Sequence, residues 1–311
     1  MALFVIHRTS MALRFTLVAV CLALATPGFA QERIPVVTTT TVLRSLVETV
    51  GGARVTATSL VPASLDAEEY QAKPQDLLRL RGARILVRIG LDYDAWLDRL
   101  LSQAGNRAVA RGGPGYVDAS FGIATLDVRG MSVGPGDGHA HGNGNPHYWL
   151  DPKNAEIMTA TIAAGLTQAD PDHAADYEAN RAAFVARLQA KLAEWETRLA
   201  TLRTTPLVAY HNSWPYFARR FRLDFVAFIE AKPGIPPSAS HLSEIMRTMR
   251  ARGVRLVVRE PHEPQRDVAF VAGKAGASVV TLATAVGALP RTDDYIALFD
   301  VNIDALTAAA R

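Results

Sequence analysis

Short runs of β-branched and aliphatic residues alternate with helical patterns along most of the chain. Strands that alternate with short helices indicate parallel βαβ units, so we predict an α/β fold with parallel sheets. The stretch at 117–128 is less regular and predicts one or two further short strands. The main predicted strands are residues 36–40, 55–60, 84–89, 207–210, 225–230, 254–259 and 279–282.

The first 30 residues have the layout of a secretory signal peptide. Arg8 and Arg14 precede an apolar run at 15–25, and small residues follow up to Ala30, after which we expect cleavage. The apolar run is too short to span a bilayer comfortably. The single cysteine, Cys21, lies inside this run, so the mature chain has none for thiolate metal sites, disulfides or nucleophilic catalysis.

A long helical pattern separates the two groups of strands. It begins after Asp170-Pro171, which ends the preceding helix, and covers about 30 residues at 172–202, or ~45 Å at 1.5 Å per residue. Such a helix predicts a rigid connection between two lobes, or alternatively it packs on one sheet only. We therefore expect a signal peptide at 1–30, α/β lobes at 31–170 and 204–311, and a linking helix at 171–203.

The charge balance argues against binding to nucleic acid or to an anionic membrane. Residues 1–30 hold two arginines and no acidic residue, so the mature chain carries 31 basic and 30 acidic side chains. This near-neutral balance gives no electrostatic footprint for a polyanion.

Three histidines lie close together in the segment HAHGNGNPHYWLDPKNA at 139–155. His139 and His141 lie in a glycine-rich loop, whereas His147 lies in a short aromatic turn immediately before a helical pattern. Neutral imidazole is the commonest protein ligand for zinc and its neighbouring metals. We therefore predict that His147 is a metal ligand, and that the other two are at most weak metal-collecting groups.

Further metal-ligating side chains follow the ends of predicted strands. Ligands of parallel α/β sheets bind beyond the carboxyl ends of the strands, so two lobes facing each other would bring these groups to His147. The candidates are Asp66, Glu68 and Glu69 after the strand at 55–60, His211 after 207–210, and Glu260 and His262 after 254–259.

Each histidine also has a purely structural interpretation. His147 could bond to backbone, and His211 could cap the helix that starts near Trp214. We expect His241, which opens a helix, to be structural, and His173 to be exposed. Glu260 could pair with Arg259 or another arginine.

Several sequence blocks resemble the metal-ion solute-binding proteins of bacterial ABC importers, the zinc- and manganese-binding family. The blocks occur in the family's order and cover nearly the whole mature chain, and HYWLDPKNA at 147–155 is the most specific. They are LVP at 60–62 with Asp66 and Tyr70, PQDL at 74–77, PHYWLDPKNA at 146–155, HNSWPYF at 211–217, PS at 237–238 before His241-Leu242, and EP at 260–261.

This resemblance implies two α/β lobes joined by a rigid helix, with one metal ion held in the cleft between them. It also implies that His147 and His211 are ligands. Zinc members have a histidine at the position of His211, where manganese members have a glutamate, and they have a histidine-bearing loop. We therefore expect a monomeric periplasmic protein, not an enzyme, that captures Zn2+, or alternatively Mn2+, and delivers it to an ABC permease of the inner membrane.

The sequence departs from the family pattern at two ligand positions. Glu68 stands where the family usually has a histidine, and it can still bind zinc through oxygen. The residues at 282–285 contain no carboxylate, although the family usually has an aspartate there. His262, Glu260, Glu69 or water could replace it, since a site with three protein ligands keeps an open position.

These departures leave other functions open. The protein could be a periplasmic metal chaperone or sensor, or it could bind another ligand in the same cleft. A zinc hydrolase is a further alternative, because two histidines, a glutamate and an open position also describe a hydrolytic site. The absence of an HExxH or comparable motif argues against the hydrolase.

Overall fold

The fold is described from a computed structural model that covers residues 33–127 and 144–310. The chain divides into an N-terminal unit, Met1–Arg33, and one compact unit, Ile34–Arg311. The predicted signal peptide and the histidines His139 and His141 lie outside the described residues. Within those residues, every helix is too short or too polar to span a bilayer.

The first lobe contains a four-stranded parallel sheet in the order β2-β1-β3-β4. Its third strand is buried along its whole length, as expected for a parallel strand covered by helices on both faces. The irregular stretch near 117–128 contributes one three-residue strand to the sheet. The elements are β1 (Ile34–Thr38), α2 (Thr41–Gly51), β2 (Val55–Ser59), α3 (Pro74–Gly82), β3 (Ile85–Arg88), α4 (Trp96–Ala104) and β4 (Tyr116–Asp118).

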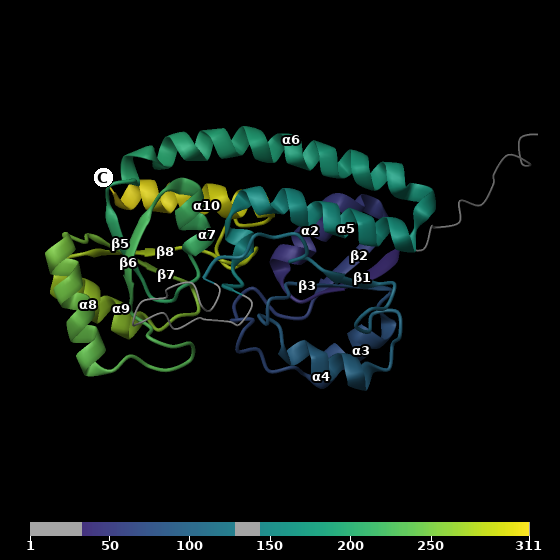
Figure 1. Cartoon of the computed structure of the whole chain (residues 1–311), viewed down its shortest axis with the longest axis horizontal. Coiled ribbons are helices and arrows are strands. Elements are labelled where there is room, and N and C mark those ends of the chain that lie inside the picture. Colours follow the sequence, from purple (N-terminus) through teal and green to yellow (C-terminus); the bar gives the residue numbers. More distant parts are fainter. Residues whose placement is uncertain (1–32, 128–143, 311) are drawn as a thin grey trace, which may run out of the picture. The chain divides into compact units, whose positions relative to one another are not determined.

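The second lobe repeats this topology with a parallel sheet in the order β6-β5-β7-β8. The two sheets and their crossover helices confirm the α/β class that the alternating pattern predicts (Figure 1). The elements are β5 (Pro206–Ala209), α7 (Pro215–Phe221), β6 (Asp224–Phe228), α8 (Ala239–Arg252), β7 (Leu256–Arg259), α9 (Gln265–Ala275), β8 (Ser278–Thr281) and α10 (Tyr295–Ala309).

Two helices in series, α5 (Ala155–Ala169) and α6 (Ala174–Arg198), lie between the sheets in the sequence. Helix α6 has 25 residues and is therefore ~38 Å long. A 3-10 turn precedes it at Pro171–His173 and another follows at Leu199–Leu202, so the predicted continuous helix at 172–202 is α-helical only in its central part.

Helix α6 contacts both lobes, so the alternative that it packs on one sheet only is wrong. Asn180 Nδ2 donates a hydrogen bond of 3.0 Å to the carbonyl of Val50 in α2. Further along, Trp195 Nε1 donates one of 2.8 Å to Asp300 Oδ1 in α10. Figure 1 shows α6 extending over both α5 and α10. We propose that residues 171–203 form the segment that links the two lobes.

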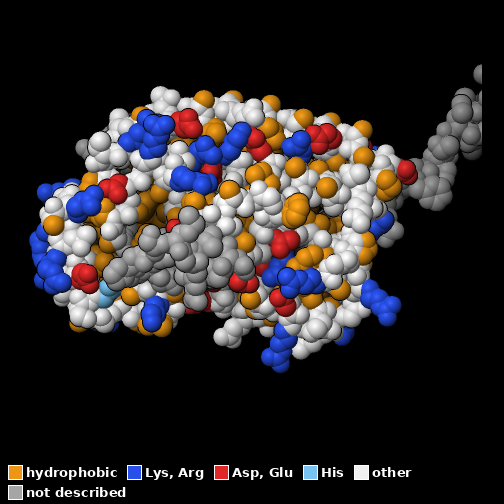
Figure 2. All heavy atoms as spheres, viewed as in Figure 1, with side chains coloured by type: hydrophobic (Ala, Val, Ile, Leu, Met, Phe, Trp, Pro, Cys, Tyr) orange, Lys and Arg blue, Asp and Glu red, His pale blue; other side chains and the backbone are white. Residues whose placement is uncertain are grey.

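The outward side of α6 is polar and balanced in charge. Arg181 lies 2.7 Å from Glu178, and Lys191 lies 3.0 Å from Glu194, each pair one helical turn apart. Figure 2 shows Lys and Arg side chains interleaved with Asp and Glu along this edge of the molecule. Exposed ion pairs of this kind contribute little to stability. The helix is therefore held by its buried aromatic and aliphatic face.

Candidate metal centre

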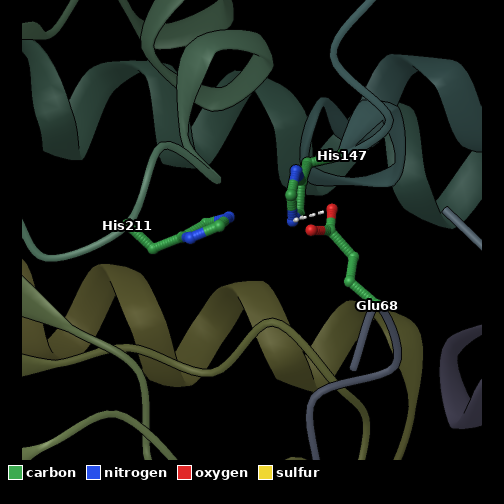
Figure 3. A group of neighbouring side chains, drawn as sticks. All are labelled: Glu68, His147 and His211. Atoms are coloured by element: carbon green, nitrogen blue, oxygen red, sulfur yellow. Dashed lines mark ion pairs between the residues drawn. The ribbon is translucent and has the colours of Figure 1, made fainter. Parts of the chain in front are cut away.

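Three ligand-type side chains from different parts of the chain converge at one point. Glu68 comes from the loop between β2 and α3, His147 precedes a 3-10 turn at Tyr148–Leu150, and His211 follows β5. Their ligand atoms all lie within 4.8 Å of one another. Figure 3 shows the His211 ring directed at His147, with the carboxylate of Glu68 beside the His147 ring. The distance from His147 Nε2 to Glu68 Oε1 is 3.8 Å.

Asn145 fixes the orientation of His147. Its Oδ1 atom accepts hydrogen bonds from the backbone N–H of His147 at 3.0 Å and from the ring Nδ1 at 3.2 Å. With Nδ1 as the hydrogen-bond donor, Nε2 is the unprotonated nitrogen, and it lies 3.8 Å from Glu68 Oε1 in the site. Asn145 Nδ2 also donates to the carbonyl of Asn212, 2.9 Å away and next to His211. One amide therefore joins the two histidine-bearing segments, which the sequence analysis did not predict.

The aromatic residues after His147 anchor its turn to both lobes. Tyr148 Oη donates a hydrogen bond of 2.7 Å to the carbonyl of Ile89, at the end of β3. Trp149 Nε1 donates one of 2.9 Å to the carbonyl of Thr284, after β8. Both aromatic side chains are fully or almost fully buried. The conformation of the turn is therefore set by tertiary contacts on either side.

His211 is buried among carboxylates. Its Nδ1 atom lies 2.5 Å from Glu230 Oε2. Burial by itself lowers the pKa of His211, but the hydrogen bond to Glu230 and the charges of Glu68 and Glu260 raise it to about 9. The surrounding carboxylates therefore favour the protonated imidazole in the metal-free protein.

Glu68 has a side chain that is only 10% exposed and comes from a loop with a local turn. Its backbone N–H donates to Asp66 Oδ1 at 2.8 Å, a local bond that favours a turn at this position. Burial raises the pKa of Glu68 from 4.5 to about 8, although the positive charge of His211 acts in the opposite direction. A bound cation would supply the charge that makes the ionised form favourable here.

The other two predicted ligands, Glu260 and His262, lie beside the three-residue cluster but outside it. The carboxylate of Glu260 is buried and accepts hydrogen bonds from the hydroxyls of Ser213 and Thr284. His262 Nε2 lies 4.0 Å from Glu260 Oε2. Thr284, in the segment where the family usually has an aspartate, thus contributes a hydroxyl that orders a neighbouring carboxylate.

One alternative interpretation, a Glu260–Arg259 pair, and one expectation, an exposed His173, are wrong. Arg259 donates its hydrogen bonds to the carbonyls of Pro261 and Glu263, so it does not pair with Glu260. His173 is half-buried, with Nδ1 2.8 Å from Asp170, and is not exposed as expected. The 3-10 turn that precedes α6 accounts for this, because it folds His173 back onto Asp170.

His241 bonds to the carbonyl of Phe228 at 3.0 Å, which agrees with the structural role expected for it. Glu230 is a site residue that the sequence analysis did not single out. The available signal was its position at the end of the predicted strand 225–230, beside the strand that His211 follows.

Comparison with known proteins gives a consistent result. A protein of Treponema pallidum (strain Nichols), named only as metal-binding, is 30% identical over 257 residues, which is 81% of this chain and 80% of that protein. The high-affinity zinc uptake system protein ZnuA of Brucella abortus (strain 2308) is 28% identical over 275 residues, 76% of this chain and 80% of its own length.

Solved structures and family assignment agree with these relatives. A crystal structure of ZnuA has a TM-score of 0.76 to this chain at 28% identity, and the match covers 90% of this chain and 100% of the other. The family described as zinc-uptake complex component A, periplasmic (ZnuA), matches residues 36–309. The chain therefore belongs to the ZnuA family.

Proposed function

We propose that this protein is a periplasmic solute-binding protein that captures a divalent metal ion, zinc in the first place, and delivers it to the permease of an ABC importer. The observation that carries the proposal is the convergence of His147, His211 and Glu68 within 4.8 Å. Two imidazoles and one carboxylate suit zinc and neighbouring first-row metals. The names of the ZnuA relatives support zinc.

A fourth donor would close a tetrahedral zinc site. Donors at 2.0–2.1 Å from zinc lie about 3.4 Å apart, so the three side chains would draw together on binding. We propose Glu260 as the added ligand, with His262 or water as the alternatives. The charge of Glu260 acts on both Glu68 and His211, and the hydroxyls of Ser213 and Thr284 orient its carboxylate.

Manganese is the alternative cargo. Glu68 replaces an imidazole of the usual set by an oxygen donor, and carboxylate oxygen suits manganese better than imidazole does. The chaperone or sensor alternative shares the same site and differs only in the partner that receives the metal. Zinc uptake by cells during chelator-induced starvation, with and without the gene, distinguishes import from a chaperone or sensor role.

Calorimetric titration of the mature protein from residue 31, stripped with a chelator, tests the binding function. We expect one zinc ion to bind tightly per chain and manganese to bind more weakly. Absence of binding by either metal would overturn the proposal and would direct the search to another ligand of the cleft.

Zinc should stabilise the protein more at high pH than at low pH. In the metal-free protein the pKa values of Glu68 and His211, about 8 and about 9, both lie above the ordinary values of 4.5 and 6.5. The folded state therefore binds more protons than the unfolded state. Its stability falls as pH rises from 4.5 to about 8 for Glu68 and from 6.5 to about 9 for His211.

Metal binding requires deprotonated ligands, so zinc should release protons near neutral pH. We expect the zinc-induced rise in melting temperature to be larger at about pH 8.5 than at about pH 6. Calorimetry in buffers of different ionisation enthalpy measures the release directly, and a binding enthalpy independent of the buffer would contradict this prediction.

A further inference from the structure

Glu230 and His211 form a close buried pair. The distance from His211 Nδ1 to Glu230 Oε2 is 2.5 Å, and the two side chains are 11% and 9% exposed. A histidine that binds a metal through one ring nitrogen commonly donates the other N–H to a carboxylate, which fixes the tautomer and the ring orientation. The pair has the geometry of that arrangement.

Pairing of two neighbouring strands brings these residues together. The backbone N–H of Ile229 donates to Ala209 O at 2.9 Å, and that of Glu230 donates to Tyr210 O at 2.8 Å. These two bonds continue the parallel β5–β6 ladder beyond both strands. Glu230 is therefore held alongside His211 by the backbone, and its position does not depend on a flexible side-chain contact.

The other oxygen of Glu230 is also occupied. Oε1 accepts a hydrogen bond of 2.9 Å from the backbone N–H of Gly234. Gly234 has a φ of +67°, and a Cβ at this position would collide with Glu69 Oε1, next to the candidate ligand Glu68. The segment at 230–236 thus extends from the second lobe to the Glu68 loop of the first.

We propose that Glu230 is a positioning residue for the metal site: it accepts the Nδ1 proton of His211, so that Nε2 is the metal donor, and the segment 230–236 links this contact to the Glu68 loop. The inference rests on the proposed metal-binding function. Removal of such a partner typically weakens metal affinity by about 10–100-fold.

The test compares zinc affinities of Glu230→Gln and the control Glu178→Gln, measured by competition with a chromogenic chelator. Glutamine keeps the shape of the side chain but removes the charge that holds the Nδ1 proton. We expect Glu230→Gln to bind zinc roughly 10–100-fold more weakly. Glu178→Gln removes an exposed carboxylate that pairs with Arg181 on α6, away from the site, and we expect it to bind with nearly wild-type affinity.

Nitrogen-15 NMR of the zinc-loaded histidines gives a readout that a merely structural role would not change. We expect wild-type His211 to bind through Nε2 and to show a slowly exchanging Nδ1 proton, which Glu230→Gln loses and Glu230→Asp partly keeps. If His211 binds zinc through Nδ1, this inference is overturned. It is also overturned if the wild type binds zinc tightly and Glu230→Gln binds it equally well; neither result affects the proposed function. Failure of the wild type to bind metal would overturn it together with the proposed function.

Discussion

Alanine at both His147 and His211 should abolish zinc binding. The two histidines supply both nitrogen donors of the three-residue cluster. Zinc sites with four protein ligands bind with about 10–16 kcal/mol, so loss of two ligands should remove roughly 5 kcal/mol or more, which exceeds a thousandfold in affinity. Calorimetric titration of the double variant measures the loss of zinc affinity. The two single variants show how much of that loss each histidine accounts for.

A matched control comes from a histidine outside the site. His173 is half-buried and pairs with Asp170 before α6, so His173→Ala should bind zinc as the wild type does. Circular dichroism of the metal-free variants checks that all of them fold. Unchanged affinity in the double variant would show that the metal binds elsewhere.

The second large effect is expected at Glu68. We expect Glu68→Ala to weaken zinc binding by roughly 100–1,000-fold, since it removes the cluster's only carboxylate donor. Glu68→His restores a donor that zinc prefers and should bind at least as tightly as the wild type. An exposed carboxylate away from the site provides the control: Glu178 pairs with Arg181 on α6, and Glu178→Ala should leave the affinity unchanged.

Loss of the Glu68 carboxylate should weaken zinc binding but should stabilise the metal-free protein. Burial raises the pKa of Glu68 to about 8, so folding disfavours its ionised form. The neutral variant Glu68→Gln should therefore unfold at a higher urea concentration at pH 8, with a free energy of unfolding a few kcal/mol larger. Normal zinc binding by this variant would show that Glu68 is not a ligand. Unchanged stability at pH 8 would show that burial does not disfavour its ionised form.

The fold could be predicted from local patterns. The runs at 36–40 and 207–210 are strongly β-branched or aliphatic, and the helices between the strands have clear apolar periodicity, so each element forms where its own residues favour it. The exact ends of the linking helix could not be predicted in the same way. The 3-10 turns at both ends of α6 depend on contacts such as that between His173 and Asp170, which composition does not specify.

The candidate site could be predicted in part. His211 and Glu68 follow predicted strands and His147 lies in a short aromatic turn, and the sequence indicates all three as donors. Their convergence, and the exclusion of His262 from the cluster, depend on how two lobes far apart in the sequence pack. Asn145 has no signature of its own, and Glu230 has only its place at the end of a predicted strand, because their roles come from hydrogen bonds to residues brought near by folding.

The sequence by itself determined the α/β class, the two sheets, the long helix between them and the chemical types available to a metal site, because these follow from short-range periodicity and from which donors the chain contains. The tertiary structure decided which donors meet, which ring nitrogen of each histidine faces the site, and how far burial shifts the pKa of Glu68. These properties depend on strand register and on the distance between lobes, and both are set by packing across the whole molecule.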